Sequence, residues 1–378
     1  MKSHIAEYVS PGHPDRLADA IVESIVDLAV GRDGEALVGV ECAVHTNHVF
    51  IDGRIASGKG RCAVSKEEIE EISRNVYREA GYGGIWIHAP ENLKVVQNVC
   101  LEPLSDDERA IRGLSDDQNV VTGYACNHPE TDYLPPAHFI ANYIGRKLDG
   151  WRRTVSDRFG PDFKVMVDIT VARPACPPQY RWNRLTLSIQ HREGVFAAEQ
   201  HELVLPVVSG ALAELEARGL AGISNLPLEN FILNGMGDFI IGGPEGDNGL
   251  SGKKLAIDFY GPEIPIGGGA ICGKDPHKVD VAGAFRAREL ARRLLKERGG
   301  SAVTVRLGWT PGDAVPAFRE AESVDSLGLT HPIPSSALPP EDWFSIGSIV
   351  ADLRLTAISR RKCLLAGYFL ESTPHEQV

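Results

Sequence analysis

The chain has 378 residues, 43% of them hydrophobic and 24% charged, with a formal net charge of −12 at pH 7. These values are typical of a globular protein with two or three domains. The acidic balance disfavours nucleic acid as a partner, and no apolar run is long enough to cross a membrane. The polar N-terminus and the seven widely spaced cysteines favour a cytoplasmic protein without a disulfide framework.

Strand and helix patterns alternate through the first hundred residues. Apolar residues at helical spacing predict a helix over residues 16–30, directly after a turn-rich segment at 10–15. Alternation predicts a strand pair within 36–51, and a helix over 66–81 precedes a strand-like stretch at 93–99. His13 and Asp15 therefore precede a helix, where they can face a ligand. Glu41 falls in a strand that we expect to be buried, and a buried carboxylate requires a cation or hydrogen bonds.

The rest of the chain mixes helices and strands without a strict alternation. The acidic, polar stretch 101–119 is expected to be a mobile lid. Helical patterns cover residues 135–159, 199–218 and 279–298, and strand patterns cover 163–171, 184–190, 231–241 and 303–307. This mixture favours an α+β fold over a doubly wound parallel sheet. Residues 323–378 carry no clear pattern, and 373–378 are expected to fray.

Two glycine-rich segments, residues 242–254 and 267–280, carry the strongest chemical signal. Glycines let backbone N–H groups approach an anion closely, and lysines add positive charge. Lys253, Lys254, Lys274 and Lys278 gather within 26 residues of an otherwise acidic chain. Carboxylates near these turns, such as Asp280, could hold a metal ion that bridges phosphate oxygens. The segments therefore predict a polyphosphate site.

An ordinary P-loop does not explain the second segment. Gly268 to Lys274 matches the first seven positions of G-x-x-x-x-G-K-[ST], but the eighth is Asp275, so the hydroxyl that would bind magnesium is missing. Two prolines within residues 261–267 also argue against a strand that leads into the motif. The metal ligands must come from elsewhere, and Asp15, Asp247 and Asp280 are the carboxylates near glycine-rich turns.

Three segments carry a specific resemblance. GHPDRLAD (12–19), GGPEGDNGLSGKKLAIDFYG (242–261) and GGGAICGKDPHKVD (267–280) resemble the signature segments of the methionine adenosyltransferases, which make S-adenosylmethionine. The resemblance extends over roughly residues 5–316. It implies three similar α/β-layered domains with mixed sheets and helices on one face, interleaved in space. We expect them at 1–100, at 101–230 with the lid at 101–119, and at 231–378.

The family's reaction implies a mechanism. Methionine sulfur attacks C5′ of ATP and expels the triphosphate, which is then hydrolysed. Sulfur needs no general base, so catalysis should depend on positioning and on neutralising the leaving group. By resemblance, His13 stabilises the departing phosphate oxygen. Asp15 and Asp280 match ligands of Mg²⁺, two ions per site being expected, and Glu41 matches the ligand of K⁺.

The resemblance also assigns the substrate contacts. Asp162 resembles a ribose-binding residue and Phe239 an adenine-stacking aromatic. Lys164, Lys274 and Asp117 join His13 as catalytic residues. The implied phosphate contacts are Lys164, Lys253, Lys254, Lys274 and Lys278, and Asp247 is expected beside both ATP and methionine. The implied methionine contacts are Gln97, Asp117, Asp247 and Lys278. The family builds its site between two subunits, which implies a homodimer or a dimer of dimers.

Departures from the family pattern gather where methionine would be held. Arg54 stands where the family has a glutamate that meets the substrate ammonium, and arginine cannot accept an ammonium's hydrogen bonds. Lys253 replaces an arginine, which changes the geometry but keeps the charge. The chain is therefore expected to be a divergent synthase. Arg54 is counted with the implied methionine contacts by its position. The alternatives are an enzyme with another thioether acceptor, which Arg54 would mark, a paralogue that binds nucleotide without catalysis, and a tripolyphosphatase or other ATP hydrolase.

Overall fold

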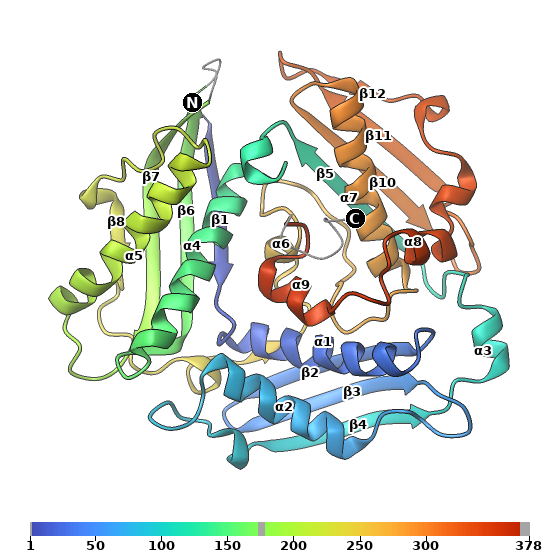
Figure 1. The fold of residues 1–378 in the computed structure, drawn as a ribbon, viewed down its shortest axis with the longest axis horizontal. Coiled ribbons are helices and arrows are strands. Elements are labelled where there is room, and N and C mark those ends of the chain that lie inside the picture. Colours follow the sequence, from blue (N-terminus) through green and yellow to red (C-terminus); the bar gives the residue numbers. More distant parts are fainter. Residues whose placement is uncertain (1, 173–177, 371–378) are drawn as a thin grey trace.

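The computed structural model describes residues 2–172 and 178–370. Within them, three four-stranded sheets with their helices form three lobes around a common centre (Figure 1). One face of each sheet is covered by helices, as the alternation of buried and exposed strand residues requires. The predicted α+β class with three helix-covered sheets is confirmed.

The first lobe carries Asp15, Glu41, Arg54 and Gln97 of the candidate site residues. Its sheet has the order β4-β3-β2-β9, with β3 and β4 parallel and the other pairs antiparallel. The helices α1 and α2 cover one face, and the other face is open. The elements are α1 (Pro14–Arg32), β2 (Leu37–His45), β3 (His48–Ala56), α2 (Lys66–Ala80), β4 (Lys94–Glu102) and β9 (Gly249–Leu250).

The second lobe has the sheet order β1-β6-β7-β8, in which only the β7–β8 pair is parallel. The helices α4 and α5 pack on it. The elements are β1 (Ser3–Val9), α4 (Pro136–Arg152), β6 (Phe159–Ala172), β7 (Gln179–His191), α5 (Ala197–Ala217) and β8 (Phe231–Leu233).

The third lobe is a fully antiparallel sheet of order β12-β11-β10-β5. The helix α7 packs on β5 and β10, and α8 packs on α7. The elements are β5 (Asn119–Cys126), α7 (Val279–Arg298), β10 (Ala302–Trp309), β11 (Phe318–Val324), β12 (Thr330–Pro332) and α8 (Ile346–Asp352). Each sheet thus combines strands that lie far apart in the sequence, so the lobes interleave along the chain.

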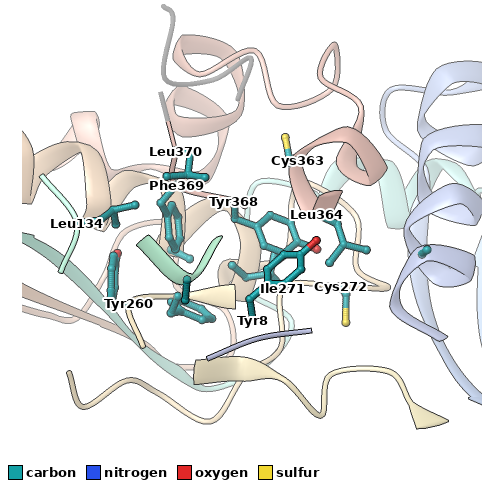
Figure 2. Close-up of a cluster of buried hydrophobic side chains, with 14 of the residues drawn as sticks. Tyr8, Leu134, Tyr260, Ile271, Cys272, Cys363, Leu364, Tyr368, Phe369 and Leu370 are labelled. Atoms are coloured by element: carbon teal, nitrogen blue, oxygen red, sulfur yellow. The ribbon is translucent and has the colours of Figure 1, made fainter. Parts of the chain in front are cut away.

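The centre between the lobes is filled by apolar and aromatic side chains (Figure 2). Tyr260 and Phe369 stack with ring centroids 5.2 Å apart. The helices α6 (Leu255–Asp258) and α9 (Arg360–Ala366) lie here. Buried Arg360 donates to Glu23 of α1 at 3.0 Å, and Tyr368 donates to the same carboxylate. Residues 323–370, which show no clear sequence pattern, thus include part of the central core.

Several predicted boundaries are confirmed and two are wrong. The predicted helix at 279–298 is α7, and the predicted helix at 66–81 is α2, ended by Gly81 in the left-handed region. The predicted helix at 135–159 ends at Arg152, and the predicted strand at 231–241 ends at Leu233. There, Asn234 has a φ of +47° and hydrogen-bonds the backbone of Ile189, which turns the chain. The predicted frayed residues 373–378 lie outside the described residues.

The stretch 101–119 is attached to the first lobe at several points. It contains α3 (Asp106–Ala110). Arg109 forms an ion pair with Asp33 at the end of α1, and Arg112 forms one with buried Asp275. The other oxygen of Asp275 accepts a hydrogen bond from the backbone N–H of Val38 at 2.8 Å. Asp275, at the position where a P-loop has its hydroxyl, therefore joins the second glycine-rich segment to β2 and to the candidate lid.

No helix among the described residues is both long and apolar enough to cross a membrane.

Asp275→Asn should destabilise the protein substantially. The change leaves the largely buried guanidinium of Arg112 without its anionic partner, which typically costs about 3–5 kcal/mol. Urea unfolding followed by circular dichroism measures the loss. Glu297→Gln, which removes one partner of an exposed i,i+4 ion pair with Arg293, is the control and should cost less than about 0.5 kcal/mol. Equal stabilities for the two variants would contradict the proposed attachment.

Candidate active site

Both glycine-rich segments lie along one edge of β2. In the first, Leu250 pairs with Ala43, and the N–H of Ser251 donates to the carbonyl of Cys42 at 2.9 Å. In the second, the carbonyl of Gly273 accepts from the N–H of Val40 at 2.9 Å. The two segments are therefore fixed relative to one another by the backbone of a single strand.

Glycine is required where the second segment approaches β2. Gly273 has a φ of +76°, and a Cβ atom there would lie 2.2 Å from the carbonyl oxygen of Val40. Any side chain would force the two backbones apart and break the contact. The glycine that resembled part of a P-loop thus serves packing against a strand.

One group of site residues surrounds the start of α1, and we call it the histidine group: His13, Asp15, Asp162, Lys164, Lys253 and Lys254. His13 is the N-cap of α1, and its Nδ1 accepts the N–H of Asp15 at 3.2 Å. Asp15 is buried, and its carboxylate accepts the N–H of Leu250 at 2.9 Å and pairs with Lys254 at 2.7 Å. The helix α1 is thereby connected to the first glycine-rich segment.

The electrostatics of the histidine group keep His13 neutral. Burial and the nearby ammonium of Lys164 lower the pKa of His13 to about 3, although Asp15 opposes the shift. Because Nδ1 accepts the backbone N–H of Asp15, the proton of the neutral ring lies on Nε2. His13 can therefore donate one hydrogen bond to an oxygen atom over the whole physiological pH range.

The pKa values of the two carboxylates in the histidine group are shifted in opposite directions. Burial raises the pKa of Asp15, but the hydrogen bonds from Lys254 and from the backbone of Leu250 outweigh it, so the net pKa is lowered. Burial raises the pKa of Asp162 to about 6, and one of its oxygens accepts the N–H of Gly243 at 2.8 Å. Its other oxygen is buried and has no hydrogen-bond partner among the described residues. Asp15 is thus an anion at neutral pH, and Asp162 offers a free acceptor to a ligand.

A second group lines a cavity of about 670 Å³ beside the second glycine-rich segment, and we call it the cavity group. The cavity lies against the open face of the first sheet and is also lined by residues 251–252 and 268–270. Its charged side chains are Glu41, Asp52, Asp116, Asp117, Lys274, Lys278 and Asp280.

The lysines of the cavity group are already paired with carboxylates. Lys274 lies 2.9 Å from Asp280, and Lys278, the N-cap of α7, pairs with Asp116. Burial raises the pKa of Asp116, but the hydrogen bond and the charge of Lys278 outweigh it and lower the pKa. Among the described residues, no hydrogen bond or ion pair joins the cavity group to the histidine group.

The structure places several predicted residues differently from the expectations. Glu41 lies on the exposed face of β2, so the expectation of a buried strand position is wrong, although it does line the cavity. Gln97 does not line the cavity; its side chain donates to the carbonyl of Lys66 at 2.9 Å, on the helix side of the sheet. Arg54 lies outside the cavity and pairs with Glu102 and Glu108.

Two other predicted residues lie near the histidine group without entering the described ion pairs. The carbonyl of Phe239 accepts the backbone N–H of His191, and the N–H of Phe239 donates to Nε2 of the His191 ring. The phenyl ring of Phe239 packs against Gly242. Asp247 is exposed, and its charge contributes to the raised pKa of Asp162. Phe239 therefore precedes the first glycine-rich segment, and Asp247 lies within it.

Sequence reasoning missed Asp52, Asn98 and Asp116 in the cavity region. Asp52 lines the cavity, and Asn98 donates to its carboxylate at 3.0 Å. The strand register pairs Asp52 with both Glu41 and Asn98. Correct alignment of the early hairpin would have shown that Asp52 shares a face with Glu41.

No group of three or more potential metal-ligating side chains occurs among the described residues. Magnesium is usually bound by one or two carboxylates together with water and substrate phosphates, rather than by a complete protein cage. Asp15 pairs with Lys254 and Asp280 pairs with Lys274, so each carboxylate provides a donor of this kind beside a lysine. The donor sets fit Mg²⁺ that arrives with a phosphate ligand.

Lysine ammonium groups, acidic metal donors and a neutral histidine that donates a hydrogen bond are the chemistry that binding of a polyphosphate requires. The fold and these side chains therefore define an α+β protein with two groups of residues that are candidates for binding a polyphosphate.

Comparisons with known proteins identify the family. Residues 2–100 match the N-terminal domain of S-adenosylmethionine synthetase, and residues 241–376 match its C-terminal domain. The S-adenosylmethionine synthase of Paramagnetospirillum magneticum is 33% identical over 320 residues, 82% of this chain and 78% of that protein. That of Maricaulis maris is 34% identical over 321 residues, 82% of this chain and 78% of that protein.

The fold agrees with this assignment. The structure of an unusual S-adenosylmethionine synthetase from Campylobacter jejuni superposes with a TM-score of 0.82 and 24% identity, covering 100% of this chain and 97% of that chain. The chain belongs to the S-adenosylmethionine synthetase family.

His13→Asn should make stability less dependent on pH in the acidic range. An unfolded histidine takes up a proton below its usual pKa of about 6.5, whereas buried His13 stays neutral down to about 3. Wild-type stability should therefore fall by an extra 1–3 kcal/mol, roughly, between pH 7 and pH 4. Asparagine keeps the N-cap and removes the titration.

Urea unfolding of the wild type and the variant at both pH values measures this difference. His201→Asn, at an exposed position on α5, is the matched control and should keep the wild-type pH slope. A His13→Asn variant with that same slope would show that His13 does not stay neutral.

Proposed function

We propose that this protein is a methionine adenosyltransferase, which converts ATP, L-methionine and water into S-adenosylmethionine, phosphate and diphosphate. Family membership supports the reaction class. The observation that carries the assignment on this chain is the histidine group, where a buried neutral imidazole lies at the start of α1 with Asp15 and Lys254.

The chemistry requires stabilisation of a leaving group and no proton transfer in the first step. A sulfur lone pair forms the bond to C5′, the C5′–O bond breaks, and its electron pair remains on the triphosphate. Nε2–H of His13 donates to the oxygen that gains charge, and the lysines neutralise the rest of the triphosphate. Lys164, Lys253 and Lys254 come from the histidine group, and Lys274 and Lys278 from the cavity group.

The other site residues hold the two substrates and the ions. Asp162 would accept a hydrogen bond from the ribose, and Phe239 would stack on adenine. Asp117 and Asp247 would lie near methionine and its developing sulfonium, which a carboxylate stabilises. Asp15 and Asp280 would bind Mg²⁺, and Glu41 would bind K⁺. When bound, Mg²⁺ offsets the negative charge of the phosphates.

We further propose that the complete site forms between two copies of the chain, the histidine group of one meeting the cavity group of the other. The absence of direct bonds between the groups among the described residues supports this arrangement. The open face of the first sheet supports it as well, because Phe50 and Val96 are 46% and 49% exposed there. Apolar side chains on an uncovered sheet suit a symmetric interface.

Turnover of ATP and methionine by the purified protein tests the proposed reaction. With Mg²⁺ and K⁺ present, mass spectrometry should detect S-adenosylmethionine, and phosphate release should depend on methionine. Phosphate release without any effect of methionine would instead identify an ATP hydrolase, and a product only with another thioether would identify a different acceptor.

Mixed dimers test whether the site is shared. His13→Ala and Lys274→Ala should each lower kcat by about 10²–10³. When the two variants are co-expressed with different tags, half of the randomly assorted dimers are mixed, and each mixed dimer holds one intact site. About a quarter of wild-type activity should therefore return. Activity no higher than that of either variant alone would place His13 and Lys274 in one chain's site.

A further inference from the structure

The cavity group contains an acidic pair that its lysines do not neutralise. Glu41 and Asp52 are paired residues on the adjacent antiparallel strands β2 and β3, and both line the cavity. Like charges directly opposite each other on neighbouring strands are destabilising. The cavity lysines, Lys274 and Lys278, pair with Asp280 and Asp116 instead. A cation from solution would relieve the repulsion between Glu41 and Asp52.

Asp52 is held in a defined position. Its Oδ1 accepts the N–H of Gly53 at 2.8 Å and the side-chain N–H of Asn98 at 3.0 Å. Asn98 is its register partner on β4, so the three strands present Glu41, Asp52 and Asn98 in one row on the open face. Gly53 has a φ of +127°, and a Cβ atom there would lie 2.1 Å from the carbonyl oxygen of Gly39. The backbone beside Asp52 therefore has little freedom to move.

Arg54 is excluded from the cavity by its own ion pairs. Its Nε and Nη2 donate to Glu102 at 3.0 and 2.8 Å, and Nη2 also donates to Glu108 of α3 at 2.8 Å. Two carboxylates thus hold the guanidinium between β4 and the stretch 101–119. Arg54 fastens the candidate lid and leaves Asp52 as the carboxylate of β3 that faces the ligand.

We propose that Asp52 binds the α-ammonium group of the amino acid substrate and so determines selectivity for an α-amino acid at the cavity. This inference rests on the proposed function. An ammonium group at hydrogen-bonding distance from Asp52 would offset the repulsion with Glu41, and Asn98 would keep the second carboxylate oxygen oriented toward the substrate. Asp52 is a binding residue and does not touch the reacting sulfur or C5′.

The test compares L-methionine with 4-(methylthio)butanoate, which has the same thioether and carboxylate but no ammonium. In the wild type, kcat/KM should favour methionine strongly. Asp52→Asn should lower kcat/KM for methionine by roughly 10- to 100-fold, the usual effect of losing a charged hydrogen bond. It should change the value for the des-amino substrate by less than about threefold and leave KM for ATP unaltered. Asp157→Asn, at an exposed position before β6, is the matched control.

A second variant, Asn98→Ala, distinguishes a specific loss of ammonium binding from a general disturbance of the site. Asn98→Ala removes only the hydrogen bond that orients Asp52, so it should lower the preference for methionine by a smaller factor, about threefold to tenfold. An Asp52→Asn variant that loses activity equally toward both substrates, or changes only the response to K⁺, would overturn the proposal.

Failure of the proposed function is recognised separately. If the wild type makes no S-adenosylmethionine, calorimetric titration with methionine and with the des-amino compound still tests Asp52. Tighter binding of methionine by the wild type, lost in Asp52→Asn, supports the inference, whereas equal binding of both compounds by the wild type overturns it.

Discussion

The edge of β2 is the constraint on which the rest of the site depends. One side of this strand pairs with β3, and its free side binds both glycine-rich segments through backbone hydrogen bonds. The helix α1, which packs on the same strand, contributes carboxylates that accept backbone N–H groups of the first segment: Asp15 accepts that of Leu250 and Asp19 that of Gly252. Such backbone contacts do not depend on flexible side chains, so they can hold lysines and carboxylates in place before any ligand arrives.

Ion pairs between lysines and carboxylates also hold these side chains in place before a ligand binds. Lys254 lies against Asp15, Lys274 against Asp280 and Lys278 against Asp116. Each pair limits the repulsion that a cluster of like charges would create in the free protein. A polyphosphate with its metal ions can replace both halves of each pair, since phosphate oxygens attract the lysine and the metal attracts the carboxylate. The free protein therefore keeps its charges near the positions in which a ligand would use them.

Sequence patterns predicted the family better than they predicted the structural contacts of individual residues. Glycine, lysine and aspartate spacing led to the correct family, and the 3.6-residue periodicity led to α7. The same patterns could not show that Asp275 is a buried partner of Arg112 and Val38, because that role depends on residues more than 150 positions away. They also overextended the strand after Phe231, since apolar residues continue past the turn at Asn234. Glu41 was correctly placed on a strand but on the wrong face, because alternation alone does not tell which face of a hairpin the helices cover.

In the proposed acceptor site, strand geometry offers more than one position for a carboxylate. Side chains two residues apart on a strand share one face and are separated by about 6–7 Å. In the proposed site, a carboxylate at position 52 of β3 faces the cavity as one at position 54 would, and Arg54 at position 54 binds Glu102 and Glu108 instead. The second glycine-rich segment has no such freedom, because its backbone lies in close contact with Val40 at Gly273. The fold thus leaves two equivalent positions for a carboxylate on β3 but only one course for the backbone at Gly273.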